Sequence, residues 1–207
     1  MSCGDDKKQN ANDIENEVDT EVITSDVDAD VNDENVVTSR EYAMKDGSKI
    51  TYESNKRGVV AMNDWPSYNE LNLEMDKIEG ADFVITKEEV DDLDAMISNL
   101  GNSIPAWLKT EEVMEDVADV QKEYKELINE SDASEKEHKE NLEELSEKFD
   151  DLREELNETV QKYIDIHKDA IEEYNEEIKK GKVDAANEEY QEEIKKMDKI
   201  ADYEEKK

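Results

Sequence analysis

The clearest pattern in the chain is a run of apolar residues whose spacing alternates between three and four. On an α-helix this spacing places the side chains along one side. The run consists of Leu142, Leu145, Phe149, Leu152, Leu156, Thr159, Tyr163, Ile166 and Ala170. Such a heptad seam predicts one long helix, from about Ser134 to Lys180, that packs on other helices as in a coiled coil. Beyond Ala170 the spacing loosens to Tyr174 and Ile178, and Gly181 ends the helix.

Shorter stripes of the same kind predict four further helices. The first begins near Pro66, which the first turn of a helix tolerates. The second begins at Thr86, and Glu89 three residues later completes a capping box. The stripes are Tyr68, Leu71, Met75 and Ile78; Val90, Leu93, Ile97 and Leu100; Val113, Val117, Val120, Tyr124 and Leu127; and Val183, Ala186, Tyr190, Ile194, Met197 and Ala201. The predicted fold of residues 64-207 is therefore mainly α, an antiparallel helical bundle or coiled coil.

Residues 39-63 have a different pattern, which predicts a small β-hairpin or meander. Two short β-prone runs, at 42–44 and 50–52, flank Asp46-Gly47. Asp-Gly is a hairpin signal because glycine accepts positive φ in the turn. Gly58 then leads into a third β-prone run. A sheet of this size must pack on other elements to be stable.

Residues 1-38 hold twelve carboxylates against Lys7 and Lys8, with no aromatic side chain. This composition cannot bury enough apolar surface to offset the entropy of ordering. We therefore expect a disordered, self-repelling acidic tether.

Asp26, Asp28 and Asp30 within the tether have the spacing of the first ligands of an EF-hand calcium loop. Val31 stands where that loop needs glycine, however, and Val37 stands where it needs glutamate. The pattern excludes an EF-hand and leaves weak, millimolar binding of divalent cations as the expectation.

Composition narrows the function further. The 207 residues carry a formal net charge of -35, with 42 % charged and 35 % hydrophobic residues. The core must then consist of narrow seams between helices. Nucleic acids and anionic lipid surfaces would be repelled by this charge. No apolar run approaches the roughly 18 residues that span a bilayer.

Sites for chemistry are not indicated. The chain has no phosphate loop, nucleophile elbow or zinc motif. Glu135 and His138 have the spacing of a di-metal bundle motif, but the second such motif is missing, so His138 is expected to face solvent. His167 lies roughly 43 Å further along the same helix. We expect no catalytic, cofactor-binding or metal-binding residues and no enzymatic activity.

Trp65 and Trp107 each lie beside a proline at a helix junction. We expect them to fill the ends of the bundle, where narrow seams need large side chains. The alternative is an exposed aromatic anchor for a partner.

The first residues, Met1-Ser2-Cys3-Gly4 followed by Asp5-Asp6-Lys7-Lys8, resemble the end of the lipobox and the short charged tether of Bacteroidota-type bacterial lipoproteins. In that family the signal peptide is cleaved before the cysteine, whose thiol then takes a lipid. The resemblance implies lipidation of Cys3 and a place at the outer membrane or cell surface. It also implies the class of small helical lipoproteins of uncharacterised function.

The sequence thus indicates a lipid-anchored envelope protein that acts as a binding or structural module for an unidentified protein partner. One alternative is an intracellular coiled-coil scaffold, cytoplasmic, that oligomerises through the seam at 142–170, with Cys3 incidental. Another is an acidic periplasmic stress protein that buffers cations with its carboxylates.

Overall fold

The computed structural model describes residues 36–43, 49–129, 134–201 and 203. Within them, three strands precede five α-helices and three short 3-10 helices. The elements are β1 (Thr38–Ala43), β2 (Lys49–Asn55), β3 (Gly58–Met62), α1 (Pro66–Gly80), α2 (Lys87–Leu100), η1 (Gly101–Ser103), η2 (Ala106–Leu108), α3 (Glu111–Asn129), α4 (Glu135–Lys179), α5 (Val183–Ile194) and η3 (Lys195–Lys199). The predicted class, mainly α with one long helix and a small sheet before the helices, is confirmed. The expected turn at Asp46-Gly47 and nearly all of the expected tether lie outside the described residues.

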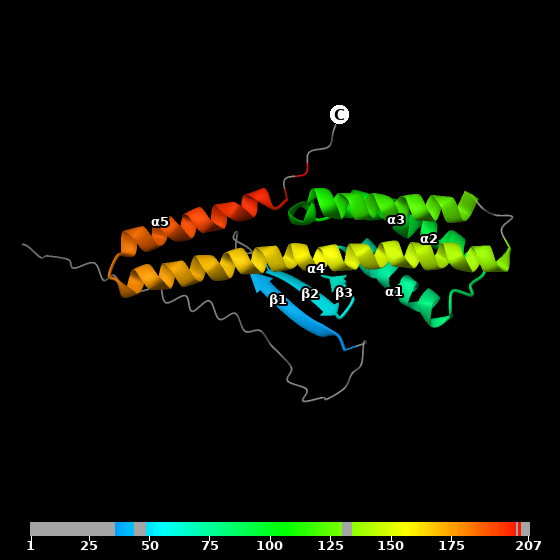
Figure 1. Ribbon diagram of the computed structural model, residues 1–207, viewed down its shortest axis with the longest axis horizontal. Helices are drawn as coiled ribbons and strands as arrows, with labels where there is room; N and C mark the ends of the chain where they lie inside the picture. The colour runs from blue at the N-terminus through cyan, green and yellow to red at the C-terminus, as the bar shows by residue number, and fades with distance from the viewer. Residues whose placement is uncertain (1–35, 44–48, 130–133, 202, 204–207) are drawn as a thin grey trace, which may run out of the picture.

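Helix α4 is the spine of the molecule. Its 45 residues extend for about 67 Å. Helix α3 runs antiparallel to the first part of α4, and α5 runs antiparallel to the second part (Figure 1). The end of α5 points towards the start of α3 (Figure 1). Between them the backbone N–H of Tyr203, which follows η3, donates to the carbonyl of Lys109, just before α3, at 3.1 Å. Two helices of the same chain therefore occupy the seam of α4 in succession.

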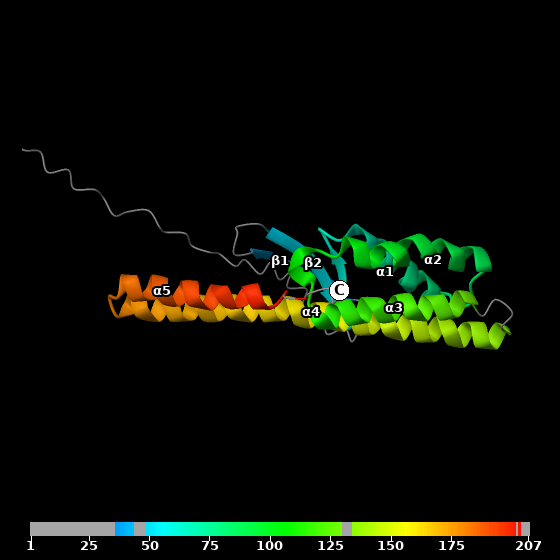
Figure 2. The same cartoon turned by 90° about the horizontal axis from the view of Figure 1, so that it is seen from above.

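The two parts of α4 are covered unequally. Helices α1, α2 and α3 and the sheet all gather around the first part (Figure 2). Among the described strands and α-helices, α5 alone lies along the second part, and residues 164–194 form a two-helix projection that we call the arm. We call the first part of α4 together with α1, α2, α3 and the sheet the thick part, and the main buried cluster fills it. A smaller cluster, built from Tyr163, Ala170, Ile194 and Met197, joins α4 to the C-terminal segment.

Local signals set the helix ends as the sequence predicted. The Thr86 hydroxyl accepts from the backbone N–H of Glu89 at 3.3 Å, and the Glu89 carboxylate accepts from the Thr86 N–H at 2.7 Å. Ser134 and Glu137 form the same reciprocal capping box at the start of α4. Such boxes satisfy N–H groups that a helix start leaves without partners. Gly181 closes the turn between α4 and α5 with a φ of 75°.

The sheet is antiparallel with strand order β1-β2-β3. One face packs on the helices, where Tyr52, Val59 and Met62 are buried. A β-bulge interrupts the pairing of β2 and β3 between Glu53 and Ser54. The sheet, as expected, is stabilised by packing on the helices rather than standing alone.

In the second half of α4 the predicted seam holds at Tyr163 and Ala170 but needs correction at Ile166 and Ile178. Ile166 is only half-buried and Ile178 is 38 % exposed, whereas His167 and Glu177 are buried. The buried side runs through positions 163, 167, 170 and 177, because a straight helix turns slightly less per residue than a strict heptad requires. Glu177 is accommodated by ion pairs with Lys180 and Lys182, at 2.6 and 3.0 Å.

The predicted stripe of the last helix also needs correction at its start. Val183, which was assigned to that stripe, is 56 % exposed. It is the first residue of α5, immediately after the turn, where α4 has already ended and offers nothing to pack against.

Candidate binding hollow between the sheet and helix α1

A buried arginine joins α1 to α4 at the centre of the thick part. Arg153 of α4 has a side chain that is only 1 % exposed. Its Nε donates to Asn72 Oδ1 at 2.8 Å, its Nη2 to Asp76 Oδ1 at 2.8 Å and its Nη1 to Asp150 Oδ1 at 2.7 Å. The guanidinium also lies over the ring of Phe149, 4.7 Å from its centroid. A charge can be buried here because its donors find partners on α1 and on α4 itself.

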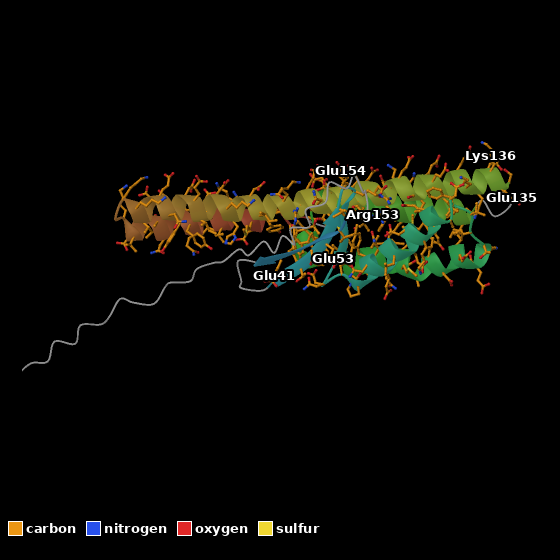
Figure 3. The ribbon with its side chains drawn as sticks, turned by 90° about the horizontal axis from the view of Figure 1, so that it is seen from below. Glu41, Glu53, Glu135, Lys136, Arg153 and Glu154 are labelled. Atoms are coloured by element: carbon orange, nitrogen blue, oxygen red, sulfur yellow. The ribbon has the colours of Figure 1, made fainter. Side chains whose placement is uncertain are left out.

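A second arginine, at the turn between β2 and β3, connects the sheet to the same carboxylates. Arg57 Nη2 donates to Glu79 Oε1 and to Asp150 Oδ1, both at 2.6 Å. Glu79 also accepts from the Ser146 hydroxyl at 2.7 Å. Asp150 thus lies between both guanidinium groups, and we call this set of residues the arginine cluster. Figure 3 labels Arg153 where α4 passes the sheet.

The ionisation of the cluster follows from these contacts. Burial alone would raise the pKa of Glu79, but hydrogen bonds from Arg57 and Ser146 outweigh it and hold the pKa below its usual value. Hydrogen bonding to Glu79 likewise raises the pKa of Arg57. Burial raises the pKa of Tyr68, whose hydroxyl donates to the carbonyl of Val59. Glu79 and Arg57 are therefore both favoured in their charged forms, and both guanidinium groups of the cluster are already engaged by carboxylates.

A hollow of about 570 Å³ opens beside the cluster, between the outer face of the sheet and α1. Its apolar lining comes from Val37, Val60, Ala61 and Leu73. Val60 and Ala61 are consecutive residues of one strand, and both line it because the bulge changes the local alternation. Leu73 is 62 % exposed and Val37 48 % exposed, so the hollow presents aliphatic surface to solvent.

The polar lining of the hollow is mostly engaged. The amide of Asn69 accepts from the N–H of Met62 at 2.7 Å and donates to its carbonyl at 2.6 Å, which covers the edge of β3. Two carboxylates remain accessible: Glu53 is exposed, and the side chain of Asp76 is 50 % exposed. The hollow therefore offers aliphatic contact and acceptors for a cation, while its guanidinium groups are occupied.

The residues singled out in the sequence are not brought together. Cys3 and the Asp26, Asp28 and Asp30 series lie outside the described residues. His138 is half-buried near the start of α4, whereas solvent exposure was expected. His167 is buried in the arm, where burial lowers its pKa.

Both tryptophans have packing roles. Trp65 is fully buried and stacks on Tyr68 with ring centroids 5.1 Å apart, as expected for a residue that fills the end of the bundle. Trp107 is partly buried, donates to Asp64 Oδ2 at 2.8 Å and meets the ring of Tyr163 edge-on. Trp107 lies in η2, just before α3, and packs on both buried clusters, so it fills the junction between the thick part and the arm.

Carboxylates also gather between α4 and α5, where six glutamates line a hollow of about 250 Å³. Burial and the nearby Glu193 raise the pKa of Glu173. Glu177 is held by its two lysines. Among the described residues no group of three or more His, Cys, Asp or Glu side chains is placed to hold a metal ion.

Comparisons with known proteins give no relative from which a function could be transferred to this chain. No family model, no curated protein and no solved structure matches this chain. Within the described part of the chain, no helix is both long enough and apolar enough to cross a membrane.

Sequence reasoning missed the arginine cluster and the hollow. One signal was available: Ser146, Arg153 and Val160 recur every seven residues on α4, next to the leucine seam. A stripe containing an arginine and a serine looks like a solvated face. Its partners, such as Asn72, are 81 positions away in the sequence.

Proposed function

We propose that this chain is a non-enzymatic binding module that takes a basic, aliphatic peptide segment of a protein partner in the hollow. Lipid on Cys3 would hold the module to the bacterial outer membrane or cell surface. The observation that carries the proposal is the exposed aliphatic lining beside two accessible carboxylates. A segment with lysine or arginine next to leucine or valine complements both parts of this lining.

The charge of the whole molecule favours the same partner. A net charge of -35 accelerates the approach of a basic segment and repels acidic competitors. The arginine cluster supports the site without competing for the ligand, since its guanidinium groups are engaged. A volume of about 570 Å³ is within the usual range of ligand sites and suits a few side chains of a longer segment.

The anchor and the acidic leader complete the proposed arrangement. A tether of some 35 residues reaches at most about 115 Å when fully extended, and much less on average. Lipoprotein-type acylation with two or three chains anchors stably, whereas one chain binds only marginally. The leader would then hold the hollow away from the lipid surface, within reach of a partner.

Peptide binding is tested with the full chain labelled with ¹⁵N and titrated with a peptide of alternating lysine and leucine. Residues that line the hollow should shift and saturate, and Leu73→Ser should weaken binding at least about tenfold. Val84→Ser is the matched control, since Val84 is 72 % exposed but lies outside the hollow. Equal effects of the two substitutions, or shifts spread evenly over the acidic surface, would contradict the proposed site.

The anchor is tested by measuring the intact mass of the native protein in the membrane fraction of its own cells. Cleavage before Cys3 with added acyl chains is the expected result. An unmodified chain that starts at Met1 in the soluble fraction would overturn the anchor and leave the hollow untouched.

A further inference from the structure

The two accessible carboxylates of the hollow differ in how they are held. Asp76 is fixed from the protein side, because its Oδ1 accepts from Arg153 Nη2 at 2.8 Å and its Oδ2 accepts from Asn72 Nδ2 at 3.3 Å. Asn72 is only 3 % exposed, and its Oδ1 accepts from Arg153 Nε at 2.8 Å, which leaves its amide N–H groups to donate to Asp76. Glu53 is exposed on β2, and no hydrogen bond or ion pair joins it to another described residue.

The bonds that hold Asp76 limit which cation it can accept. A guanidinium binds a carboxylate best through two parallel N–H···O bonds, one to each oxygen. On Asp76 such a fork would share both oxygens with Asn72 and Arg153, and it would bring a second guanidinium beside that of Arg153. An ammonium is a compact charge that needs one oxygen and can keep water on its other donors. Asp76 is therefore better suited to lysine than to arginine.

Leu73 supplies the apolar half of the same subsite. It precedes Asp76 by three residues on α1, so the two side chains lie on one side of the helix with Cβ atoms about 5–6 Å apart. Both line the hollow, and Leu73 is 62 % exposed. The four methylene groups of a lysine side chain can lie along apolar surface while the ammonium reaches a polar partner. A lysine can thus contact Leu73 with its stem and Asp76 with its head.

We propose that Asp76 selects lysine over arginine in the peptide that the hollow binds, and that Arg153 and Asn72 are positioning residues for its carboxylate. This inference rests on the proposed peptide binding and adds the identity of the cation. A carboxylate that is already held in place loses little side-chain entropy when a ligand arrives. Glu53 adds attraction for either cation without selecting between them, because its exposed carboxylate is not held in one orientation.

Three peptides of alternating cation and leucine, titrated into the full ¹⁵N-labelled chain, test the selection. The lysine peptide should bind roughly tenfold more tightly than the arginine peptide, which corresponds to one charge-assisted hydrogen bond. The trimethyllysine peptide keeps the charge but has no N–H donor on its side chains, so it should bind as weakly as the arginine peptide. Equal affinity of the lysine peptide and either other peptide, with shifts in the hollow, would overturn the selection and leave peptide binding intact. If no peptide shifts the hollow residues, the proposed function fails as well.

Variants of the two carboxylates assign the selection to one residue. Asp76→Asn keeps an acceptor for Arg153 and should bring the lysine and arginine affinities within about twofold of each other. Asp76→Glu keeps the charge but moves the carboxylate away from its two holders, so it should strengthen binding of the arginine peptide. Glu53→Gln is the matched control, which should weaken both peptides by the same factor and preserve their ratio. If Glu53→Gln abolished the preference and Asp76→Asn preserved it, Asp76 would not be the selecting residue.

Discussion

Gly58 is where the sheet comes closest to α4, and replacing it with alanine tests how the two are joined. Gly58 has a φ of 113°, and a Cβ atom there would lie 2.2 Å from the carbonyl oxygen of Arg153 and 2.5 Å from its carbonyl carbon. Ordinary contacts begin near 3.4 Å, and both atoms belong to helix backbone that cannot rotate away. The sheet must therefore move off α4 or the helix must bend.

The cost can be worked out from two contributions. Left-handed backbone conformations cost a non-glycine residue about 1–3 kcal/mol. Overpacking a well-packed interface costs about 1–3 kcal/mol more. Gly58→Ala should therefore lower the free energy of unfolding by about 2–6 kcal/mol, and each kcal/mol corresponds to about 2–4 °C in melting temperature for a chain of this size.

Two other glycines supply matched controls. Gly181 has a φ of 75° but nothing within 4 Å of its Cβ position, so Gly181→Ala carries the backbone strain alone. Gly80, at the end of α1, has neither a left-handed φ nor a neighbour, and Gly80→Ala should stabilise by about 0.5–1 kcal/mol. The difference between the first two substitutions isolates the clash with α4.

Urea unfolding, followed by tryptophan fluorescence and by far-ultraviolet circular dichroism, measures all three variants. Trp65 is buried in the same cluster as the sheet, so its emission reports the loss of that packing. If Gly58→Ala cost no more than Gly181→Ala, the close approach of sheet and helix would be refuted.

Three further substitutions test the electrostatics. Arg153→Met should lower the free energy of unfolding, measured in urea, by about 3 kcal/mol, because it leaves the carboxylates beside α1 without their buried cation. Arg57→Met, at a 32 % exposed site, is the control, and a cost for Arg153→Met below that of Arg57→Met would contradict this reasoning. Burial, with Glu155 and Asp151 nearby, raises the pKa of Asp116 from 3.8 to about 6, so native stability should fall as pH rises from about 4 to about 6 and stay low above that. Asp116→Asn should therefore stabilise the chain at pH 8 and make little difference near pH 3, where the carboxyl is mostly protonated in both states. A difference that does not change with pH would argue against this assignment. Burial lowers the pKa of His167, so the arm should lose stability as pH falls below 6.5. Amide hydrogen exchange of the arm measures this loss, and His167→Gln should abolish it. If the variant responds to acid as the original chain does, the loss belongs to other groups.

The parts of the fold that the sequence predicted are those determined by neighbouring residues. Thr86 and Ser134 mark the starts of α2 and α4, because each capping residue has its glutamate three residues later in the sequence. The apolar seam of α4 could be predicted over its first part, because large apolar residues there lie along a single side of the helix. In the arm, apolar character favoured Ile166 over His167, although helix geometry places the histidine towards α5.

The arginine cluster could not be predicted in the same way. Arg57 and Asp150 are 93 positions apart, and so acidic a chain supplies an equally plausible carboxylate for either arginine at almost any position. The hollow depends on a bulge that changes the direction of one side chain, and on α1 packing along the edge of β3. Both are consequences of tertiary packing, which no spacing in the sequence records.

The end-to-end arrangement of α3 and α5 on one continuous helix has a consequence for how the molecule comes apart. Neither short helix spans the junction, so breaking the Tyr203–Lys109 hydrogen bond and the contacts around Tyr163 would release α5 without opening the larger core. Such a chain has two cooperative units that share α4 as their template. Trp65 lies in the larger unit, so its fluorescence should miss an early loss of helix that circular dichroism records, whereas Trp107 packs at the junction and would report it. The offset between the two curves would measure the free energy that holds α5 in place.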